Sequence, residues 1–386
     1  MEVRKGYKQT EVGVIPEDWE VQQIKNIATI KTGSRNTQDK VDNGIYPFFV
    51  RSQIVESINS YSFDGEAVLT AGDGVGVGKV IHYVNGKFDC HQRVYRITDF
   101  SPTINGYFFY LYFCNNFYNR VMQMTAKSSV DSVRMEMLAN MPIPIPKSFK
   151  EQIAIATALS DADALISSLE KLIEKKRAIK QGAMQELLMP KEGWEVKQLG
   201  EIAEVRDGTH QTPRYVDYGI PFYSVESVTN NNFTNTKYIS EEEHNFLTKS
   251  FTIEKGDILM TRIGSIGDCK LIDWDVNASF YVSLALLKIK EGFSANYICH
   301  YSKTSQFKKE ADLNSLQSAI PRKINLGPIS NIRIELPDFN EQTRIATILS
   351  DMDAEIAGLE EKLSKYKQVK QGMMQELLTG RVRLVD

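Results

Sequence analysis

The sequence predicts an α+β protein in which two globular α/β domains are joined by two long antiparallel coiled-coil helices with pseudo-two-fold symmetry. Three observations predict this architecture. The chain has 386 residues, more than one hydrophobic core usually serves. Residues 151–188 and 341–378 align without a gap and share 22 identities in 38 positions. Each copy follows a stretch of strand-like and turn-like sequence, so the repeated unit is a globular domain followed by a helix.

The composition is typical of a soluble globular protein, with 42 % apolar and 25 % charged residues and a mean hydropathy of −0.30. The net charge is −3 and the isoelectric point about 6.1. Proteins that bind nucleic acid by themselves are usually basic. Any role on DNA must therefore rest on local positive patches or on a partner that supplies positive charge.

The sequence predicts a cytoplasmic protein without membrane contact or a metal site. No apolar run approaches the roughly 18 residues of a membrane helix, and the polar start MEVRKGYKQT argues against a signal peptide. The four cysteines form no C-x-x-C pair. Cys90 precedes His91 and Cys299 precedes His300, but neighbours on a strand point to opposite faces and rarely share a metal.

The first globular domain is predicted over residues 1–147. It contains the glycine-rich stretch AGDGVGVGK at 71–79, which resembles a phosphate-binding loop. That loop needs glycine where the chain has Asp73, and serine or threonine where it has Val80. The dinucleotide pattern G-x-G-x-x-G also fails. We therefore interpret the stretch as a glycine-rich turn between strands, where backbone approaches another segment closely.

Catalytic motifs are absent from the sequence. It contains no G-x-S-x-G, H-E-x-x-H or zinc-deaminase pattern. No two prolines are adjacent, which excludes the Asn/Asp-Pro-Pro-aromatic motif of amino-methyltransferases. The five histidines are scattered along the chain. The chain is predicted to be non-enzymatic by itself.

A long spacer helix is predicted over residues 148–189. Ser148 and Glu151 form a capping-box pattern at its start, and Pro190 follows its end. Apolar residues recur at alternating spacings of four and three, as in a coiled-coil seam. A helix of 38 residues would extend about 57 Å, far beyond the mean globular helix. The alternative is that each apolar stripe is the buried face of an ordinary helix. The seam residues are Ile155, Leu159, Ala162, Ile166, Leu169 and Ile173.

The second half of the chain repeats this plan. A second globular domain is predicted over 190–337, a second spacer helix over 338–380 and a tail over 381–386. The opening WEVQQIKNIATIKTG at 19–33 returns as WEVKQLGEIAEVRDG at 194–208. The domains match only at framework positions, which favours one scaffold adapted to two different targets. The seam of the second helix comprises Ile345, Leu349, Met352, Ile356, Leu359 and Leu363.

These features resemble the specificity subunits of type I restriction-modification systems over essentially the whole chain. The resemblance rests on the doubled EQ-x-x-IA-x-x-LSD-x-D helix, the two WEV openings and the start YKQTEVGVIPEDWEV. It also rests on DGTHQTP at 207–213 and RIGSIG at 262–267. The first domain departs from the pattern, with KTGSRNTQD in place of DGTHQTP.

The resemblance implies a division of labour within a phage-defence complex. The two globular domains would be target recognition domains, each of which reads one half of a split sequence in double-stranded DNA. The helices would set the spacing and dock two adenine methyltransferase (modification) subunits, and restriction/translocase subunits would complete the enzyme. No cofactor is expected in this chain, because S-adenosylmethionine, ATP and Mg²⁺ would bind to the partner subunits.

Candidate DNA contacts are side chains of the types that read bases, placed on the divergent loops. Each of them has the alternative of being a solvated loop residue. In the first domain the candidates are Lys31, Ser34, Arg35, Asn36, Ser52, Gln53, Lys127, Ser128 and Arg134. In the second domain they are Thr209, His210, Gln211, Arg214, Glu226, Ser227, Arg262, Ser265, Gln317, Arg322 and Lys323.

Two other functions remain open at the level of sequence. A stand-alone, two-headed DNA-binding regulator would bind DNA as a purified chain with steep salt dependence, which the isoelectric point of about 6.1 argues against. A coiled-coil scaffold without DNA would need no basic or amide residues on its divergent loops, and DGTHQTPR and KTGSRN argue against it. Because the loops of the two domains differ, we expect the DNA target to be asymmetric and bipartite.

Overall fold

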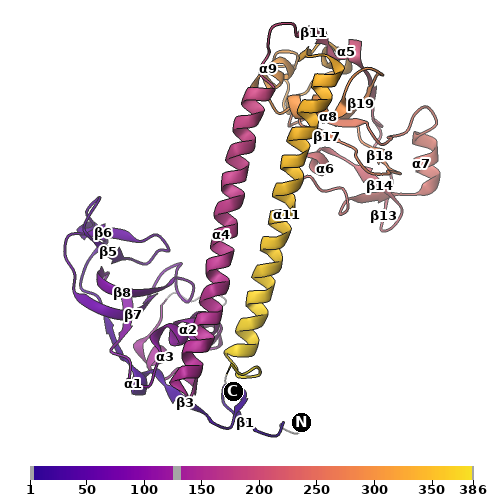
Figure 1. Ribbon diagram of the computed structural model, residues 1–386. Helices are drawn as coiled ribbons and strands as arrows, with labels where there is room; N and C mark the ends of the chain where they lie inside the picture. Colours follow the sequence, from indigo (N-terminus) through magenta and orange to yellow (C-terminus); the bar gives the residue numbers. More distant parts are fainter. Residues whose placement is uncertain (1–3, 125–131, 385–386) are drawn as a thin grey trace. The chain divides into compact units, whose positions relative to one another are not determined.

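The computed structural model describes residues 4–124 and 132–384 and confirms the predicted α+β class with two related domains (Figure 1). The chain separates into two compact units, residues 1–170 with 361–386 and residues 171–360. Each unit therefore combines one globular domain with one half of each long helix. Within the described residues, no helix is long and apolar enough to cross a membrane.

The first unit is built around a six-stranded sheet. All neighbouring strands are antiparallel except β5 and β8, which run parallel. Alternate residues of β7 and β9 face the helices and supply buried apolar side chains such as Val68 and Ile97. The strand order is β4 (Thr29–Thr32), β9 (Val94–Thr98), β7 (Phe63–Ala71), β8 (Ile81–Cys90), β5 (Tyr46–Phe49) and β6 (Glu56–Ile58).

Helix α2 (Gly106–Gln123) supplies most of the aromatic core of this unit. Phe109, Phe113 and Phe117 are buried and stack in succession along it. The remaining elements are β1 (Tyr7–Thr10) paired with β2 (Gly13–Pro16), β3 (Trp19–Gln23) paired with β10 (Pro142–Pro146), α1 (Ile24–Ile27), α3 (Met135–Ala139) and a 3₁₀ turn at Thr37–Asp39. Strand β10 tolerates its alternate prolines because it has one partner, so its outer edge needs no N–H donors.

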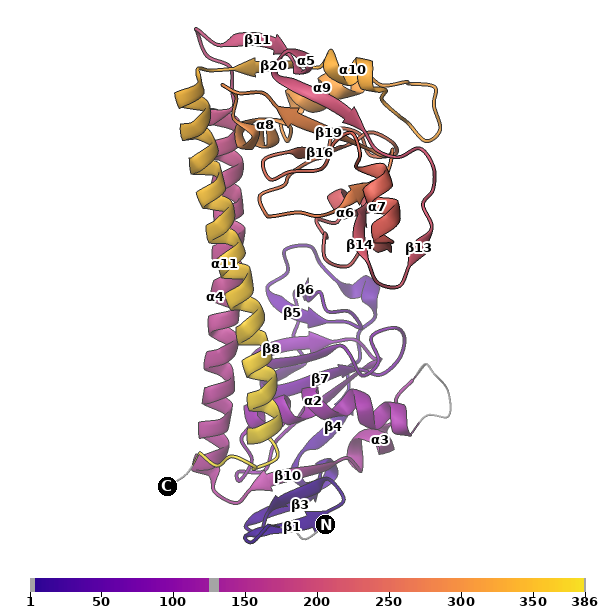
Figure 2. The same ribbon diagram turned by 90° about the vertical axis from the view of Figure 1, so that its right-hand side faces the viewer.

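The second unit follows the strand order of the first, with one additional strand at an edge. Figure 2 labels several strands of both units. The counterpart of β8 in the second unit is interrupted, so the sheet separates into two four-stranded parts. One part is β12 (Ala203–Asp207), β19 (Leu284–Ile289), β16 (Ile258–Thr261) and β17 (Cys269–Leu271). The other is β13 (Tyr215–Val216), β15 (Lys237–Ile239), β14 (Ile220–Tyr223) and β18 (Ser279–Phe280). Strands β14 and β18 run parallel, like β5 and β8.

Short helices and one further strand pair complete the second unit. Their buried residues, including Tyr297, Tyr301 and Phe307, form a core against β16 and β19. The elements are β11 (Glu195–Gln198) paired with β20 (Arg333–Leu336), α5 (Leu199–Ile202), α6 (Val225–Thr229), α7 (Glu241–Leu247), α8 (Ala295–Tyr301), α9 (Ser305–Leu313) and α10 (Leu326–Ser330).

The repeated segments form the two long helices α4 (Phe149–Leu187) and α11 (Phe339–Leu377), each of 39 residues. Their starts are capped by side-chain oxygens, because the backbone N–H of Glu151 donates to Ser148 Oγ (3.4 Å) and that of Glu341 donates to Asp338 Oδ1 (3.0 Å). The seam residues named above are buried or half-buried in both helices. The apolar stripe is therefore the inward face of each helix.

Ion pairs show that α4 and α11 run antiparallel within each unit. Two ion pairs of the first unit recur in the second unit, with both partners displaced by 190 positions in the sequence. In the first unit Asp163 pairs with Lys370 (2.5 Å) and Glu170 with Lys367 (2.7 Å). In the second unit Lys180 pairs with Asp353, and Arg177 with Glu360.

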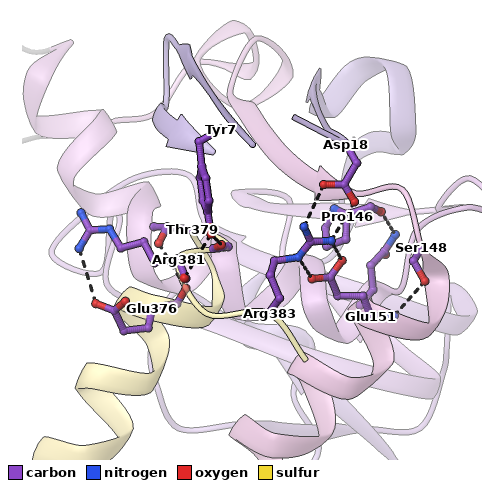
Figure 3. A network of polar contacts seen from close by, with 11 residues as sticks. Tyr7, Asp18, Pro146, Ser148, Glu151, Glu376, Thr379, Arg381 and Arg383 are labelled. Carbon is purple, nitrogen blue, oxygen red and sulfur yellow. Dashed lines mark hydrogen bonds and ion pairs between the residues drawn. The ribbon is translucent and has the colours of Figure 1, made fainter. Parts of the chain in front are cut away.

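The two ends of the described chain meet in the first unit (Figure 3). The Tyr7 hydroxyl donates a hydrogen bond to the carbonyl oxygen of Gly380 (3.0 Å). Arg383 contacts both Asp18 and Glu151, and the Glu151 side chain is fully buried. Gly380 has a φ of 68°, and a Cβ there would lie 2.6 Å from Pro16. Ordering the C-terminal segment therefore also fixes the N-terminal hairpin and the start of α4.

Candidate nucleic-acid interface

Four loop segments of the first domain share one backbone hydrogen-bond network that includes the end of β5, and a fifth loop segment follows β5 directly. We call them loop cluster 1, residues 33–36, 50–53, 72–74, 91–93 and 132–134. Their backbone N–H groups donate from Arg35 to Cys90 O, Gln92 to Arg35 O, His91 to Phe49 O, Gly72 to Arg93 O and Val133 to Gly72 O, at 2.8–3.4 Å. Four of the loops follow the ends of separate strands and the fifth precedes α3, and the network holds them at fixed positions relative to one another.

The second domain builds the same network at equivalent positions. We call its segments loop cluster 2, residues 208–211, 224–227, 262–265, 281–283 and 322–325. The corresponding N–H donors are Thr209 to Phe280 O, Val282 to Thr209 O, Tyr281 to Tyr223 O, Arg262 to Ser283 O and Ile324 to Arg262 O, at 2.9–3.2 Å. Isolated parallel bridges join Arg35 with His91 and Thr209 with Tyr281 in the same way. Each bond therefore defines a pair of equivalent residues.

Side chains at the equivalent positions differ in charge and size. Where cluster 1 has Arg35 and Arg93, cluster 2 has Thr209 and Ser283. Arg51 follows Phe49 by two residues, as Val225 follows Tyr223. Asp73, which bridges Ser132, corresponds to Ile263, which bridges Lys323. One backbone network thus carries two different sets of side chains.

Asp73 binds two arginines in cluster 1. Its carboxylate lies 2.7 Å from Arg51 Nη1 and 3.3 Å from Arg93 Nη1. His91 is buried beside them, and its Nδ1 accepts the backbone N–H of Arg93 (3.0 Å). Burial lowers the pKa of His91, and the positive charge of Arg51 lowers it further. His91 is therefore neutral at pH 7 and acts as a hydrogen-bond acceptor that fixes the 91–93 turn.

The structure brings Arg35 and Asn36 of the predicted set into cluster 1. Arg35 pairs with the buried Asp89 (Nε–Oδ2 3.2 Å) and donates to Ser60 Oγ (3.0 Å). The Asn36 side chain accepts a hydrogen bond from Gln92 (2.7 Å). Both side chains remain partly accessible. Contact of either residue with DNA stays a prediction.

The other candidates of the first domain lie at the same loops or beside them. Ser52 and Gln53 are exposed in cluster 1, and exposed Arg134 immediately precedes α3. Ser34 is exposed on the loop after β4, whereas Lys31 lies within β4 and pairs with Arg96 across the sheet. Lys127 and Ser128 lie outside the described residues.

Two candidates of the second domain, Arg262 and Ser227, were expected on exposed loops but are buried. The Arg262 side chain is 8 % exposed, and its Nη1 lies 2.5 Å from Asp207 Oδ1 while its Nε donates to Ile324 O (3.1 Å). Ser227 is buried in α6, where its Oγ accepts the backbone N–H of Ser224 (3.2 Å). Both side chains satisfy internal donors or acceptors, and so they stabilise the loops.

Several other candidates of the second domain do lie on the loops. His210 is exposed and contacts Asp207 (2.8 Å), and Gln211 next to it is exposed. Arg322 is partly buried, where it pairs with Asp312 (2.6 Å) and donates to Gln317 (2.7 Å). The remaining candidates are half-buried Thr209 and Ser265, the latter hydrogen-bonded to Asp268, and exposed Arg214, Glu226, Gln317 and Lys323.

Each loop cluster borders a cavity. In the first domain a cavity of about 410 Å³ is lined by Asp73, Gln92, Arg93 and Arg134 among others. In the second domain a cavity of about 710 Å³ is lined by three asparagines, Asn230, Asn232 and Asn235, together with Tyr215 and Tyr281. The linings are polar and differ in charge, as the loops do. Among the residues that the structure describes, no group of three or more metal-ligating side chains comes together.

Sequence reasoning missed Arg51, Arg93, Gln92 and Asp73. A signal existed, because CHQR at 90–93 occupies the place of FYVS at 280–283. The change from apolar to charged letters at matched positions marks a divergent loop. Arg51 stands next to the candidates Ser52 and Gln53, but the letters alone do not show that it faces Asp73.

Comparisons with known proteins agree with this duplicated arrangement. The sequence model of the family described as type I restriction modification DNA specificity domain matches the chain twice, at residues 16–181 and 191–369. The type I restriction enzyme MjaVIII specificity subunit of Methanocaldococcus jannaschii is 24 % identical over 406 residues, covering 96 % of this chain and 94 % of that protein.

Solved structures share the fold. The type I restriction-modification S subunit of M. genitalium superposes with a TM-score of 0.67 at 17 % identity, covering 98 % of each chain. A chain from a study of complex assembly and conformational transition of the type I restriction-modification system superposes with a TM-score of 0.55 at 14 % identity. That second match covers 95 % of this chain and 99 % of the other.

Proposed function

This chain belongs to the family of type I restriction-modification DNA specificity proteins, and from that premise we propose that its two domains read the two halves of an asymmetric, bipartite DNA target. Loop cluster 1 would read one half and loop cluster 2 the other. The relatives are named as specificity subunits, and this chain is likewise a non-catalytic specificity subunit. Its contribution to the reaction is the choice of the DNA site.

The observation that carries the proposal is the pair of loop clusters. Both domains keep the same five backbone hydrogen bonds, while the side chains at the equivalent positions change. The stability of the loops does not by itself account for the difference between Arg93 and Ser283, or between Asp73 and Ile263, at equivalent positions of the two domains. Base recognition gives such a reason, because each base pair presents a different pattern of donors and acceptors in the major groove.

Partner subunits would supply the chemistry. We propose that two methyltransferase subunits dock on the chain and methylate adenine with S-adenosylmethionine, and that restriction/translocase subunits use ATP and Mg²⁺. The duplicated plan supports two equivalent docking surfaces, because each unit contains one domain, the N-terminal half of the long helix that follows it and the C-terminal half of the other long helix. The net charge of −3 supports a complex in which partners provide much of the phosphate contact.

Methylome sequencing tests this proposal. Cells that express the chain with its methyltransferase partner are compared with cells that express the methyltransferase alone. The proposal predicts methyladenine in a split motif with two different halves, and only where the chain is present. The length of the unread spacer is measured at the same time.

Two results would contradict the proposal. One is the absence of new methylation although chain and active methyltransferase form a stable complex, which would favour a scaffold. The other is sequence-specific binding by the purified chain alone, with steep salt dependence and no effect on methylation, which would favour a stand-alone regulator.

A further inference from the structure

Loop cluster 1 carries two exposed arginines, Arg51 and Arg93, at positions where cluster 2 has no arginine. The side chains of Arg51 and Arg93 are 45 % and 64 % exposed, whereas that of Asp73 between them is 20 % exposed. The carboxylate is therefore partly covered while much of each guanidinium faces outward. Arg93 and Asp73 also line the cavity of about 410 Å³.

The position of Asp73 is fixed by the glycine-rich turn at residues 71–79. Gly72 donates to Arg93 O (2.8 Å), and a Cβ on Gly72 would lie 2.9 Å from that same oxygen. Gly74 has a φ of 80°, which favours glycine. The two glycines thus allow the close approach and the turn that place the Asp73 carboxylate between Arg51 and Arg93.

We propose that Arg51 and Arg93, oriented by Asp73, read guanine in the half-site recognised by the first domain. This inference rests on the proposed function and assigns a base to it. Guanine presents two acceptors, N7 and O6, at the edge of the major groove, and the planar guanidinium fork of arginine matches them. Adenine carries an N6 donor where guanine has O6, and arginine has no acceptor to receive it.

Asp73 adds selectivity by restricting the guanidinium orientation before DNA binds. A free arginine side chain loses rotamer freedom on binding, and a carboxylate that already holds one edge reduces this loss. His91 adds no positive charge to the site because it is neutral, and it fixes the backbone of Arg93. Removal of the arginines is expected to reduce discrimination against the wrong base by about 5- to 150-fold.

The equivalent positions of the second domain carry no such group. Val225, Ser283 and Ile263 stand where the first domain has Arg51, Arg93 and Asp73. The reading of guanine by this route is therefore confined to one half of the target. This asymmetry gives the inference a signature that general loss of DNA affinity does not have.

The test is methylome sequencing with the full chain and its methyltransferase partner, for wild type, Arg51→Ala, Arg93→Ala and Asp73→Asn. Arg206→Ala is the matched control, because Arg206 is 43 % exposed and paired with Glu204 but lies on β12, outside both loop clusters. We expect the arginine variants to accept any base pair at a G·C position in one half-site. The other half-site should stay unchanged, and Asp73→Asn should relax the same position more weakly.

The outcomes separate the inference from the proposed function. Wild type without a split motif would overturn both. The inference alone would be overturned if wild type gives a split motif and the arginine variants keep that motif while methylation falls equally at all sites. Loss of a phosphate contact weakens binding to all sequences about equally, so this result would assign the arginines to phosphates. Relaxation at an A·T position, or in both half-sites, would also overturn the inference. Variant complexes are checked by thermal unfolding, and Asp73→Asn, which keeps both arginines, decides the matter if an arginine variant unfolds.

Discussion

Arg383 and Glu151, which are 232 positions apart in the sequence, form a two-point ion pair that joins the C-terminal segment to the start of α4. The Nε and Nη2 atoms of Arg383 lie 2.5 and 2.8 Å from the two carboxylate oxygens of Glu151. Glu151 is fully buried. Arg383 also binds Asp18, and this hydrogen bond lowers the pKa of the Asp18 carboxyl.

The substitution Arg383→Ala is expected to destabilise the first unit by about 3 kcal/mol, because it leaves a buried carboxylate without its partner. Urea unfolding of the full chain measures the loss. Arg381→Ala is the matched control, since Arg381 is 64 % exposed and lies 3.6 Å from Glu376. An exposed pair contributes about 0–1 kcal/mol. Equal losses for the two variants would contradict a special role for the Arg383 contact.

The ion pair of Asp163 with Lys370 is expected to contribute about 1 kcal/mol, since both groups are partly exposed. A double-mutant cycle with Asp163→Ala and Lys370→Ala measures their coupling free energy. Because the pairing recurs in both units, a similar value is expected for Lys180 with Asp353 in the second unit. Coupling in one pair and none in the other would show that the two halves are not energetically equivalent.

Stability is expected to fall as the pH is lowered below about 6.5, in part through His300. Burial lowers the pKa of His300 to about 4, and the positive charge of Lys303 contributes, partly offset by Asp353. The unfolded state then binds more protons than the folded state between pH 6.5 and about 4, so stability is lost as pH falls through this window. The loss amounts to about 2 kcal/mol by pH 5.

Thermal unfolding of wild type and His300→Asn at pH 7.5 and pH 5 isolates this contribution, because the acidic residues titrate in both proteins. The variant should lose less stability than wild type on acidification. An identical pH dependence for the two proteins would show that His300 is not held neutral in the folded state.

The buried Arg262 is expected to support loop cluster 2 without reading bases. Arg262→Ala should cost about 3 kcal/mol, because it removes a buried guanidinium and leaves Asp207 with only the exposed His210 as a partner. It should reduce methylation at all sites without changing the motif. Arg214→Ala, at an exposed position, should change stability by no more than about 0.5 kcal/mol. A relaxed motif with full stability in Arg262→Ala would instead assign a base contact to this residue.

The helices and the duplicated plan were predictable because their signals are local or repeated. Capping residues at 148 and 338 and the apolar stripe depend on spacing along one helix, which the sequence shows directly. The strands β17 and β18 together correspond to the single strand β8 of the first unit. The sequence shows no equally clear signal for the break between them.

The candidate site was only partly predictable, because its geometry depends on contacts between distant segments. Arg51 and Arg93 are 42 positions apart, and only the network of cluster 1 brings both to Asp73. The burial of Arg262 and Ser227 is likewise a tertiary property, because arginine and serine are usually exposed. The pattern of residue types therefore located the loops better than it identified the accessible side chains on them.

The most direct test of the central claim compares the methylation motifs of two double variants, one in each loop cluster. The first is Asn36→Ala with Gln92→Ala, and the second is His210→Ala with Gln211→Ala. If each domain reads one half of the target, the first variant relaxes one half-site only and the second relaxes the opposite half-site only. Relaxation of the same half-site by both variants, or of both half-sites by either one, would contradict the account.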